Sequence, residues 1–225
     1  DEIKKYSDIA FTAMNSASEM GVVALFAEAT QRSTELPMLA QAAIACIDVV
    51  GGDSQPYINW LVWPELLHTG SLIIDDVQDR SEIRRGGPTC HAIHGEAIAI
   101  NAGNAAYFIG QVLLLGHQLS SDVKLKVYEL YFETMRAAHA GQAMDISGFY
   151  HLMPAVIASG NSEDLERKVL AVHRLKSAVP ASMLAQVGAI KGNGTTEQID
   201  GLGHFFESLG LAFQIIDDVL DYDGD

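Results

Sequence analysis

The stretch SLIIDDVQDRSEIRRGG, residues 71–87, joins an apolar run to three aspartates at positions i, i+1 and i+4 and then to two adjacent arginines. On an α-helix with about 100° between residues, Asp75, Asp76 and Asp79 share one face at the end of the helix. Carboxylates this close repel one another unless positive charge lies among them, and a helix C-terminus is itself unfavourable for anions. The segment therefore needs a positive partner.

The same pattern occurs a second time near the end of the chain. AFQIIDDVLD, residues 212–221, again leads from apolar residues into D-D-x-x-D, with Asp217, Asp218 and Asp221. Carboxylate oxygens suit Mg²⁺, which is usually shared between one or two carboxylates and the oxygens of a substrate phosphate. One such motif fits a solvated acidic helix end equally well, whereas two copies beside apolar sequence favour metal ions that hold a diphosphate.

The arginine pair follows the first aspartate cluster in a loop that ends in Gly-Gly-Pro. The guanidinium groups of Arg84 and Arg85 can bind phosphate oxygens bidentately and would complete a diphosphate site. The alternative is that they pair locally with Glu82 and Asp79 and do nothing else.

Composition and periodicity predict one all-α domain. The chain has 225 residues, 48% of them hydrophobic, and apolar residues recur every three or four positions through most of it. Breakers rich in Gly, Pro, Ser and Asn separate the helical stretches. We expect helices near residues 3–29, 37–50, 56–79, 91–117, 121–148, 163–191 and 196–222.

Charge excludes two classes of partner. Fourteen Lys and Arg against twenty-nine Asp and Glu leave a formal charge of −15, which argues against nucleic acids and anionic membranes. Residues 97–116 carry no charge, but Asn101, Asn104 and Gln111 would be costly in lipid, so a buried helix is favoured over a membrane span.

The two cysteines bear on localisation. Cys46 and Cys90 form no CxxC or framework pattern, and the chain starts without a signal-peptide pattern. We therefore expect reduced thiols and a cytoplasmic protein.

Over most of its length the chain resembles the trans-isoprenyl diphosphate synthases of the polyprenyl synthetase family, in particular geranylgeranyl and longer-chain diphosphate synthases. The resemblance rests on ELLHTGSLIIDDVQD, RRGGPTCHAIHGEAIAINAGN, HAGQAMDI, HRLKSA and LGLAFQIIDDVLD, in the family's order. It implies an isoprenoid-synthase-type bundle of long helices around a deep central cavity, one trans-prenyltransferase domain over residues 1–225, and a homodimer.

The resemblance also implies the reaction, a Mg²⁺-dependent head-to-tail condensation of isopentenyl diphosphate with an allylic prenyl diphosphate. About three Mg²⁺ ions, or Mn²⁺, would bind the allylic diphosphate through both aspartate motifs. The catalytic and metal-binding residues it implies are Asp75, Asp76, Asp79, Asp217, Asp218 and Asp221, with Lys176 as a further catalytic group.

The remaining roles are divided between the two substrates. The residues implied to bind the allylic diphosphate are Arg84, Lys176, Ser177, Gln142 and Gln214, and those for isopentenyl diphosphate are His68 and Arg85. Without the resemblance, His68, Gln142 and Gln214 would be ordinary buried polar residues. His173, His91 and His94 have no visible third metal ligand, so packing or loop hydrogen bonding is favoured for them.

Product length would be set on the helix that carries the first cluster. Ser71 and Gly70 lie four and five residues before Asp75, on the next turn, and Leu67 lies one turn deeper. In the resembling family, bulky aromatics at the first two positions stop growth at C15. Two small residues therefore imply a product of C20 or longer.

Two departures from the family pattern leave alternatives open. TQRSTELPM, residues 30–38, stands where a Gly-Lys-x-x-Arg-Pro segment is expected and has Arg32 as its only base, and the chain ends short of a C-terminal basic segment. We expect these segments to be missing from the sequence and not from the protein. The alternatives are a class I terpene cyclase, against which Arg85 and His68 argue, and a non-catalytic partner subunit, against which the two intact aspartate clusters argue.

Overall fold

The structure is a computed structural model that describes residues 38–57, 62–115 and 119–223. Almost all of the described secondary structure is helical, and the sheet within it is a two-stranded antiparallel hairpin. This confirms the predicted all-α class. The predicted helix at 3–29 and the segment around Arg32 lie outside the described residues.

Contacts divide the chain into two compact units. The first contains α3 Val62–Asp79, β1 Ile83–Arg84, β2 Gly87–Pro88, α4 Cys90–His94 and α5 Glu96–Leu115. The second contains most of α2 Met38–Val49, then α6 Ser121–Ser147, η2 Tyr150–Leu152, α7 Met153–Ser159, α8 Glu163–His173, η3 Arg174–Ala178, α9 Val179–Lys191 and α10 Thr196–Asp223. That the whole chain forms one domain stays a prediction.

In the first unit, α3 and α5 pack backbone against backbone at a pair of glycines. A Cβ atom on Gly70 would lie 2.7 Å from the Cβ of Ala106 and 2.9 Å from the carbonyl oxygen of Gly103. A Cβ on Gly103 would lie 2.9 Å from the carbonyl oxygen of Gly70. Such distances leave no room for a side chain, so both glycines are needed for this helix contact.

This contact bears on one of the residues that the sequence places at the product pocket. Gly70 is buried against α5, and its effect on product length stays a prediction. Helix packing therefore explains why residue 70 is small. Ser71 is exposed on α3 and its Oγ donates to the carbonyl oxygen of His68 at 2.8 Å, so it remains a candidate for the pocket.

α5, which covers most of the uncharged stretch, has one buried face and one exposed face. Ala99, Gly103 and Ala106 are buried, while Asn101 and Asn104 are exposed. This differs from the expected fully buried helix, because the polar residues lie on the face that is not packed. Within the described part of the chain, no helix combines the length and apolarity that crossing a membrane requires.

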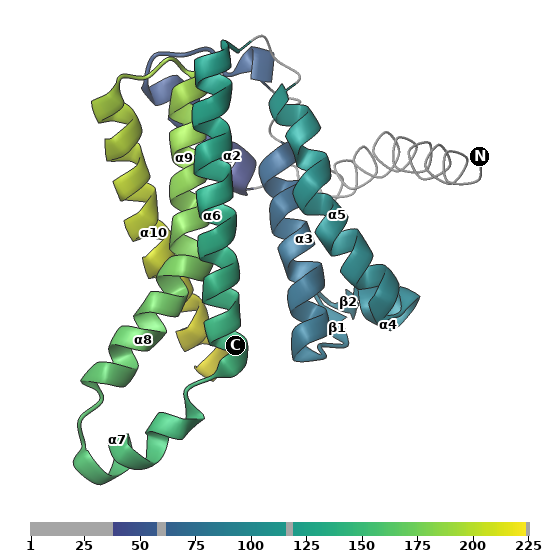
Figure 1. Ribbon diagram of the computed structural model, residues 1–225, viewed down its shortest axis with the longest axis vertical. Helices are drawn as coiled ribbons and strands as arrows, with labels where there is room; N and C mark the ends of the chain where they lie inside the picture. Colours follow the sequence, from purple (N-terminus) through teal and green to yellow (C-terminus); the bar gives the residue numbers. More distant parts are fainter. Residues whose placement is uncertain (1–37, 58–61, 116–118, 224–225) are drawn as a thin grey trace. The chain divides into compact units, whose positions relative to one another are not determined.

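The second unit is built on α6, α9 and α10, which run side by side in Figure 1. α8, η3 and α9 follow one another without a break, and η3 is one turn of π-helix in which the N–H of Val179 bonds to the carbonyl of Arg174. Pro180 explains the irregularity, because proline has no N–H to give to residue i−4. Opposite this turn, a Cβ on Gly141 of α6 would lie 2.8 Å from the backbone nitrogen of Lys176.

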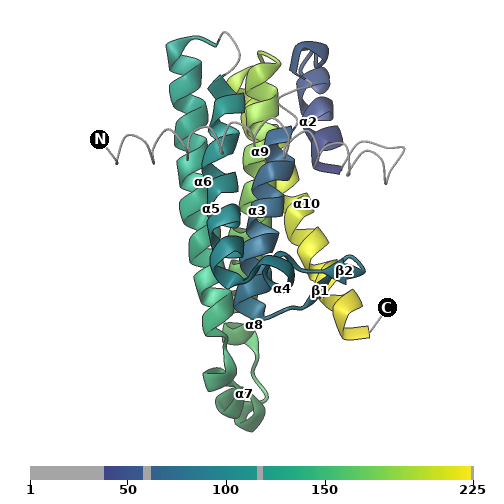
Figure 2. The ribbon, with the colours of Figure 1, turned by 90° about the vertical axis from the view of Figure 1, so that its right-hand side faces the viewer.

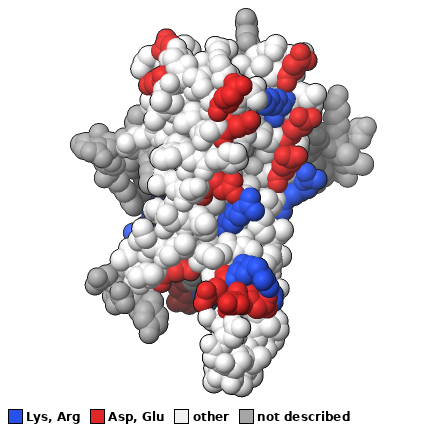
Figure 3. Space-filling view, turned by 90° about the vertical axis from the view of Figure 1, so that its left-hand side faces the viewer, with Lys and Arg blue, Asp and Glu red and all other residues white. Residues whose placement is uncertain are grey.

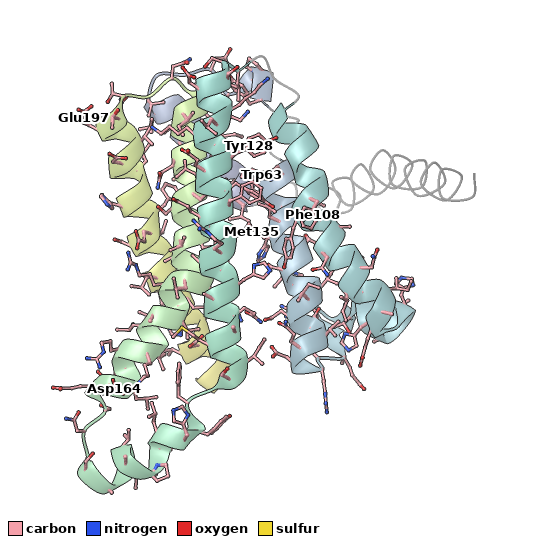
Figure 4. The ribbon with its side chains drawn as sticks, viewed as in Figure 1. Trp63, Phe108, Tyr128, Met135, Asp164 and Glu197 are labelled. Atoms are coloured by element: carbon pink, nitrogen blue, oxygen red, sulfur yellow. The ribbon has the colours of Figure 1, made fainter. Side chains whose placement is uncertain are left out.

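α10 begins at a reciprocal cap. The N–H of Gln198 donates to Thr195 Oγ1 at 3.3 Å, and the N–H of Thr195 donates to Gln198 Oε1 at 2.8 Å. Glu197, in the first turn (Figure 4), has a pKa below its ordinary value because it accepts hydrogen bonds from its own backbone N–H and from Thr195. The face shown in Figure 3 carries acidic side chains among fewer basic ones, as the net charge of −15 leads one to expect.

Candidate functional site

The first aspartate cluster has its positive partner within the same unit. Arg84 Nε donates to Asp76 Oδ1 at 2.6 Å, and Arg84 Nη2 lies 3.5 Å from Asp75 Oδ2. The Asp76 side chain is only 4% exposed, against 18% for Asp75 and 35% for Arg84. Charge-assisted hydrogen bonds of this kind are strong when they are shielded from water. A local pairing, as considered from the sequence, does occur, and it joins Arg84 to Asp75 and Asp76.

The chain reaches this pairing by two sharp reversals. α3 ends because Arg80 adopts φ 57°, and the N–H of Ser81 then bonds back to the carbonyl of Asp76 at 2.9 Å. The β1–β2 hairpin turns at Arg85 and Gly86, with φ 52° and 77°, and lies beside the end of α3 (Figure 2). Thr89 fixes its base, because its Oγ1 donates to the carbonyl of Ser81 at 2.8 Å.

The hairpin also brings both arginines close to His68. The pKa of His68 is below its ordinary value because of partial desolvation and because of the positive charges of Arg85 and Arg84. His68 is therefore favoured in its neutral form. The three residues assigned from the family resemblance to the two diphosphates thus share one electrostatic environment, while their individual roles stay predictions.

Two further residues next to this cluster were not found from the sequence. Burial and the charge of Asp75 raise the pKa of Tyr107 on α5, and burial and the charge of Asp76 raise the pKa of Cys90 on α4. Nothing in the sequence marks Tyr107, because its proximity depends on how α5 packs on α3. Asp79, the last residue of α3, is exposed.

The second aspartate cluster has different surroundings. Asp218 accepts a hydrogen bond at each carboxylate oxygen: Gln214 Nε2 lies 2.9 Å from Oδ1, and His173 Nε2 lies 2.8 Å from Oδ2. Gln214 in turn accepts from Ser177 Oγ at 2.5 Å. Asp217 is exposed and has no partner among the described residues. The side chain of Asp221 lies outside the described part of α10.

The π-helical turn η3 carries the expected diphosphate ligands Lys176 and Ser177. Lys176 Nζ donates to Asp145 Oδ2 of α6 at 2.7 Å, with side chains 30% and 48% exposed. Gln142, also on α6, is half-buried. Asp145 is part of the stretch HAGQAMDI, and its pairing with Lys176 follows from the contact between α6 and η3. π-helical turns are often found at functional sites.

The residues fit a hard divalent cation. No three His, Cys, Asp or Glu side chains already converge as a metal site in the part of the chain that the structure describes. Carboxylate oxygens are nevertheless the ligands Mg²⁺ prefers, and Arg84 stands in for a cation by placing positive charge 2.6 Å from the shielded Asp76. The β1–β2 hairpin therefore holds the Arg84 guanidinium beside the first aspartate cluster, and a bound metal ion would replace that positive charge.

Comparison with known proteins identifies the family of the chain. The family model polyprenyl synthetase matches residues 34–225. Geranylgeranyl pyrophosphate synthase 4 of Arabidopsis thaliana is 34% identical over 182 residues, which are 79% of this chain and 47% of the relative. Geranylgeranyl pyrophosphate synthase 6, mitochondrial, of the same plant is 34% identical over 82% of this chain and 54% of the relative.

Solved structures match the fold as well. The geranylgeranyl pyrophosphate synthetase of Pyrococcus horikoshii aligns with a TM-score of 0.71 and 29% identity, over 84% of this chain and 54% of that one. The decaprenyl diphosphate synthase of Rhodobacter capsulatus aligns with a TM-score of 0.66 and 28% identity, over 84% and 52%. The chain spans about half the length of the relatives it matches. By its sequence, its two aspartate clusters and its helical fold, the chain belongs to the polyprenyl synthetase family.

Proposed function

We propose that this chain acts in a geranylgeranyl-type prenyl diphosphate synthase, which condenses isopentenyl diphosphate with an allylic prenyl diphosphate. The observation that carries the proposal is the shielded pairing of Arg84 with Asp75 and Asp76. When substrate binds, the carboxylates of such a pair can bind metal ions in place of the guanidinium, and the guanidinium can bind the diphosphate in place of the carboxylates. The family and the names of the relatives support the substrate class.

Divalent cations would be held by the carboxylates of both clusters, Asp75, Asp76, Asp79, Asp217, Asp218 and Asp221. When bound, Mg²⁺ supplies Lewis-acid stabilisation of the charge that grows on the departing diphosphate.

The chain's own cations would act on the allylic diphosphate. Arg84 would turn from Asp76 to the substrate oxygens, since a bidentate guanidinium suits either anion. Lys176 would leave Asp145 in the same way, because both side chains of that pair retain solvent exposure. Ser177, Gln142 and Gln214 would donate or accept hydrogen bonds that orient the diphosphate.

The second substrate would bind through His68 and Arg85. The neutral His68 can donate one hydrogen bond, and Arg85, exposed at the tip of the hairpin, supplies the charge for the diphosphate of isopentenyl diphosphate. We also propose the predicted homodimer and the cytoplasmic localisation, on the resemblance and on the cysteine pattern respectively.

Product length is proposed to depend on Ser71 and, one turn deeper, on Leu67. Small or flexible side chains there leave space for a tail of C20 or longer. Ser71→Phe should shorten the product toward C15, because the inserted ring would occupy space in the pocket that is proposed to hold the growing tail.

Product analysis by mass tests the whole proposal. The protein is incubated with Mg²⁺, isopentenyl diphosphate and each of the C5, C10 and C15 allylic diphosphates, and the expected product is C20 or longer. Ser159→Phe on α7 is the control for Ser71→Phe, because Ser159 is also an exposed helical serine that bonds to a backbone carbonyl. A product formed without isopentenyl diphosphate would replace the proposal with a cyclase. A wild-type product of C15, or an unchanged product from Ser71→Phe, would show that Ser71 does not limit the pocket.

A further inference from the structure

We propose that His173 is a positioning residue that fixes the Asp218 carboxylate for metal binding. The inference rests on the proposed function only in taking Asp218 as a metal ligand. Its starting point is that His173 Nε2 lies 2.8 Å from Asp218 Oδ2, across the contact between the end of α8 and α10.

The burial of His173 separates it from an ordinary surface pair. The His173 side chain is only 11% exposed, while the Asp218 side chain that it contacts is 49% exposed. A buried imidazole has lost rotamer freedom and solvent, so it holds its N–H in a fixed direction. The exposed carboxylate gains its orientation from that fixed donor.

The second ring nitrogen points to the same conclusion. His173 Nδ1 is buried and has no hydrogen-bond partner in the described residues. A buried polar atom without a partner is costly, and an apolar side chain would fill this position more favourably. The contact with Asp218 is the polar interaction that His173 makes among the described residues, and it gives a reason for a histidine here.

The other oxygen of Asp218 is fixed from the opposite direction. Gln214 Nε2 donates to Oδ1 at 2.9 Å, and Gln214 is held through its own Oε1 by Ser177 Oγ. The resulting sequence of contacts, Ser177 to Gln214 to Asp218 to His173, sets both carboxylate oxygens and leaves their remaining lone pairs for a cation. Hydrogen-bonded partners of ligating carboxylates commonly change metal affinity by about 10- to 100-fold.

The neighbouring aspartate supplies an internal contrast. Asp217 has no partner among the described residues, so nothing there sets its rotamer before a ligand binds. His173 therefore gives Asp218 a preorganised orientation that Asp217 lacks. It acts through Asp218 and is not itself placed as a metal ligand, because its Nε2 is occupied by the carboxylate.

The test is calorimetric binding of Mn²⁺ with inorganic pyrophosphate, which needs no turnover. His173→Ala should weaken binding by about 10- to 100-fold. His173→Gln should restore most of the affinity, because a glutamine amide nitrogen can reach the place of Nε2. His173→Asn should not restore it, because its amide nitrogen corresponds to Nδ1. His204→Ala, which removes an exposed histidine of α10, should bind as the wild type does.

Three results would overturn the inference. One is wild-type affinity in His173→Ala. Another is equal affinity in His173→Gln and His173→Asn, a comparison that tests the positioning role even if His173→Ala does not fold. Asp218→Ala separates the remaining case. If it binds Mn²⁺ and pyrophosphate as tightly as the wild type, the metal role of Asp218 fails and the positioning role with it. If Asp218→Ala is weak but His173→Ala is not, only the positioning role fails.

Discussion

The two aspartate clusters have the same D-D-x-x-D sequence but are stabilised in opposite ways. In the first, Asp76 is 4% exposed and its charge is balanced by Arg84 from a hairpin eight residues away. In the second, Asp218 is 49% exposed and is oriented by His173 and Gln214, while Asp217 remains open to solvent. The first cluster therefore depends on charge neutralisation by Arg84, and the second on water and on hydrogen bonds from His173 and Gln214.

The difference teaches that a shared motif does not imply a shared resting state. A cation entering the first cluster must displace a guanidinium, whereas one entering the second meets a carboxylate that is already aimed and accessible. Both clusters should matter equally for turnover, but only the first should matter for the stability of the ligand-free protein. The predictions below separate these two properties.

The largest effect is expected on turnover. Asp75→Ala and Asp217→Ala should each lower kcat by about a thousandfold or more, because under the proposed function each would remove a ligand from a metal that stabilises the departing diphosphate. Steady-state kinetics at saturating Mg²⁺ measures this, with circular dichroism as the check on folding. Near wild-type turnover in either variant would remove that cluster from the reaction.

A smaller effect is expected on stability, where the two clusters should differ although they matter equally for turnover. Asp76→Asn should lower the free energy of unfolding by about 2 kcal/mol, since it breaks a shielded ion pair and leaves Arg84 only its longer contact with Asp75. Asp217→Asn should change it by less than about 0.5 kcal/mol, as is usual for an exposed residue without partners. Urea unfolding in the absence of divalent cations measures both.

A control variant links the first loss to the ion pair. Arg84→Gln should destabilise the wild type but add little in the Asp76→Asn background, because the interaction is already broken there. Equal losses from Asp76→Asn and Asp217→Asn would contradict the proposed difference between the clusters.

A glycine-to-alanine substitution should also cost more stability on α3, which carries the first cluster, than on α10, which carries the second, although the difference should be smaller. A Cβ on Gly70 would lie 2.7 Å from Ala106 Cβ, whereas a Cβ on Gly210 of α10 would lie 3.0 Å from Ala178 Cα and from Ala181 Cβ. Gly70→Ala should cost about 1–2 kcal/mol by overpacking. Gly210→Ala should be close to neutral, because the higher helix propensity of alanine, worth about 1 kcal/mol, offsets a milder contact. Thermal unfolding measures the stability of both variants, and a greater loss of stability from Gly210→Ala than from Gly70→Ala would contradict this order.

Much of the fold could be predicted from periodicity and breakers. The helix expected at 121–148 is observed as Ser121–Ser147, and the one expected at 196–222 as Thr196–Asp223. The helix expected at 91–117 is broken at Gly95, which has φ 83°, and the one expected at 163–191 contains the π-helical turn η3. Residues 150–159 also form helices where none was expected, because a short segment gives too little periodicity to detect.

In the candidate site, too, local features could be predicted from the sequence and tertiary contacts could not. The aspartates could be identified because their spacing places them on one helix face, a local property. The partners of Arg84, Asp218 and Lys176 could not, because they depend on a hairpin and on contacts between helices far apart in the chain. His173 shows this most clearly. The sequence offers no third metal ligand beside it and so favours packing, and its contact with Asp218 becomes visible only when α8 lies against α10.

The proposed function requires that both clusters bind one metal-bound diphosphate. A double-mutant cycle in calorimetric binding of Mn²⁺ with inorganic pyrophosphate tests it most directly, using Asp76→Asn, Asp217→Asn and the double variant. If one ligand needs both clusters, the double variant should lose little more affinity than either single variant, so that the losses are non-additive. Losses that add within about 0.5 kcal/mol would show two independent sites and contradict the account.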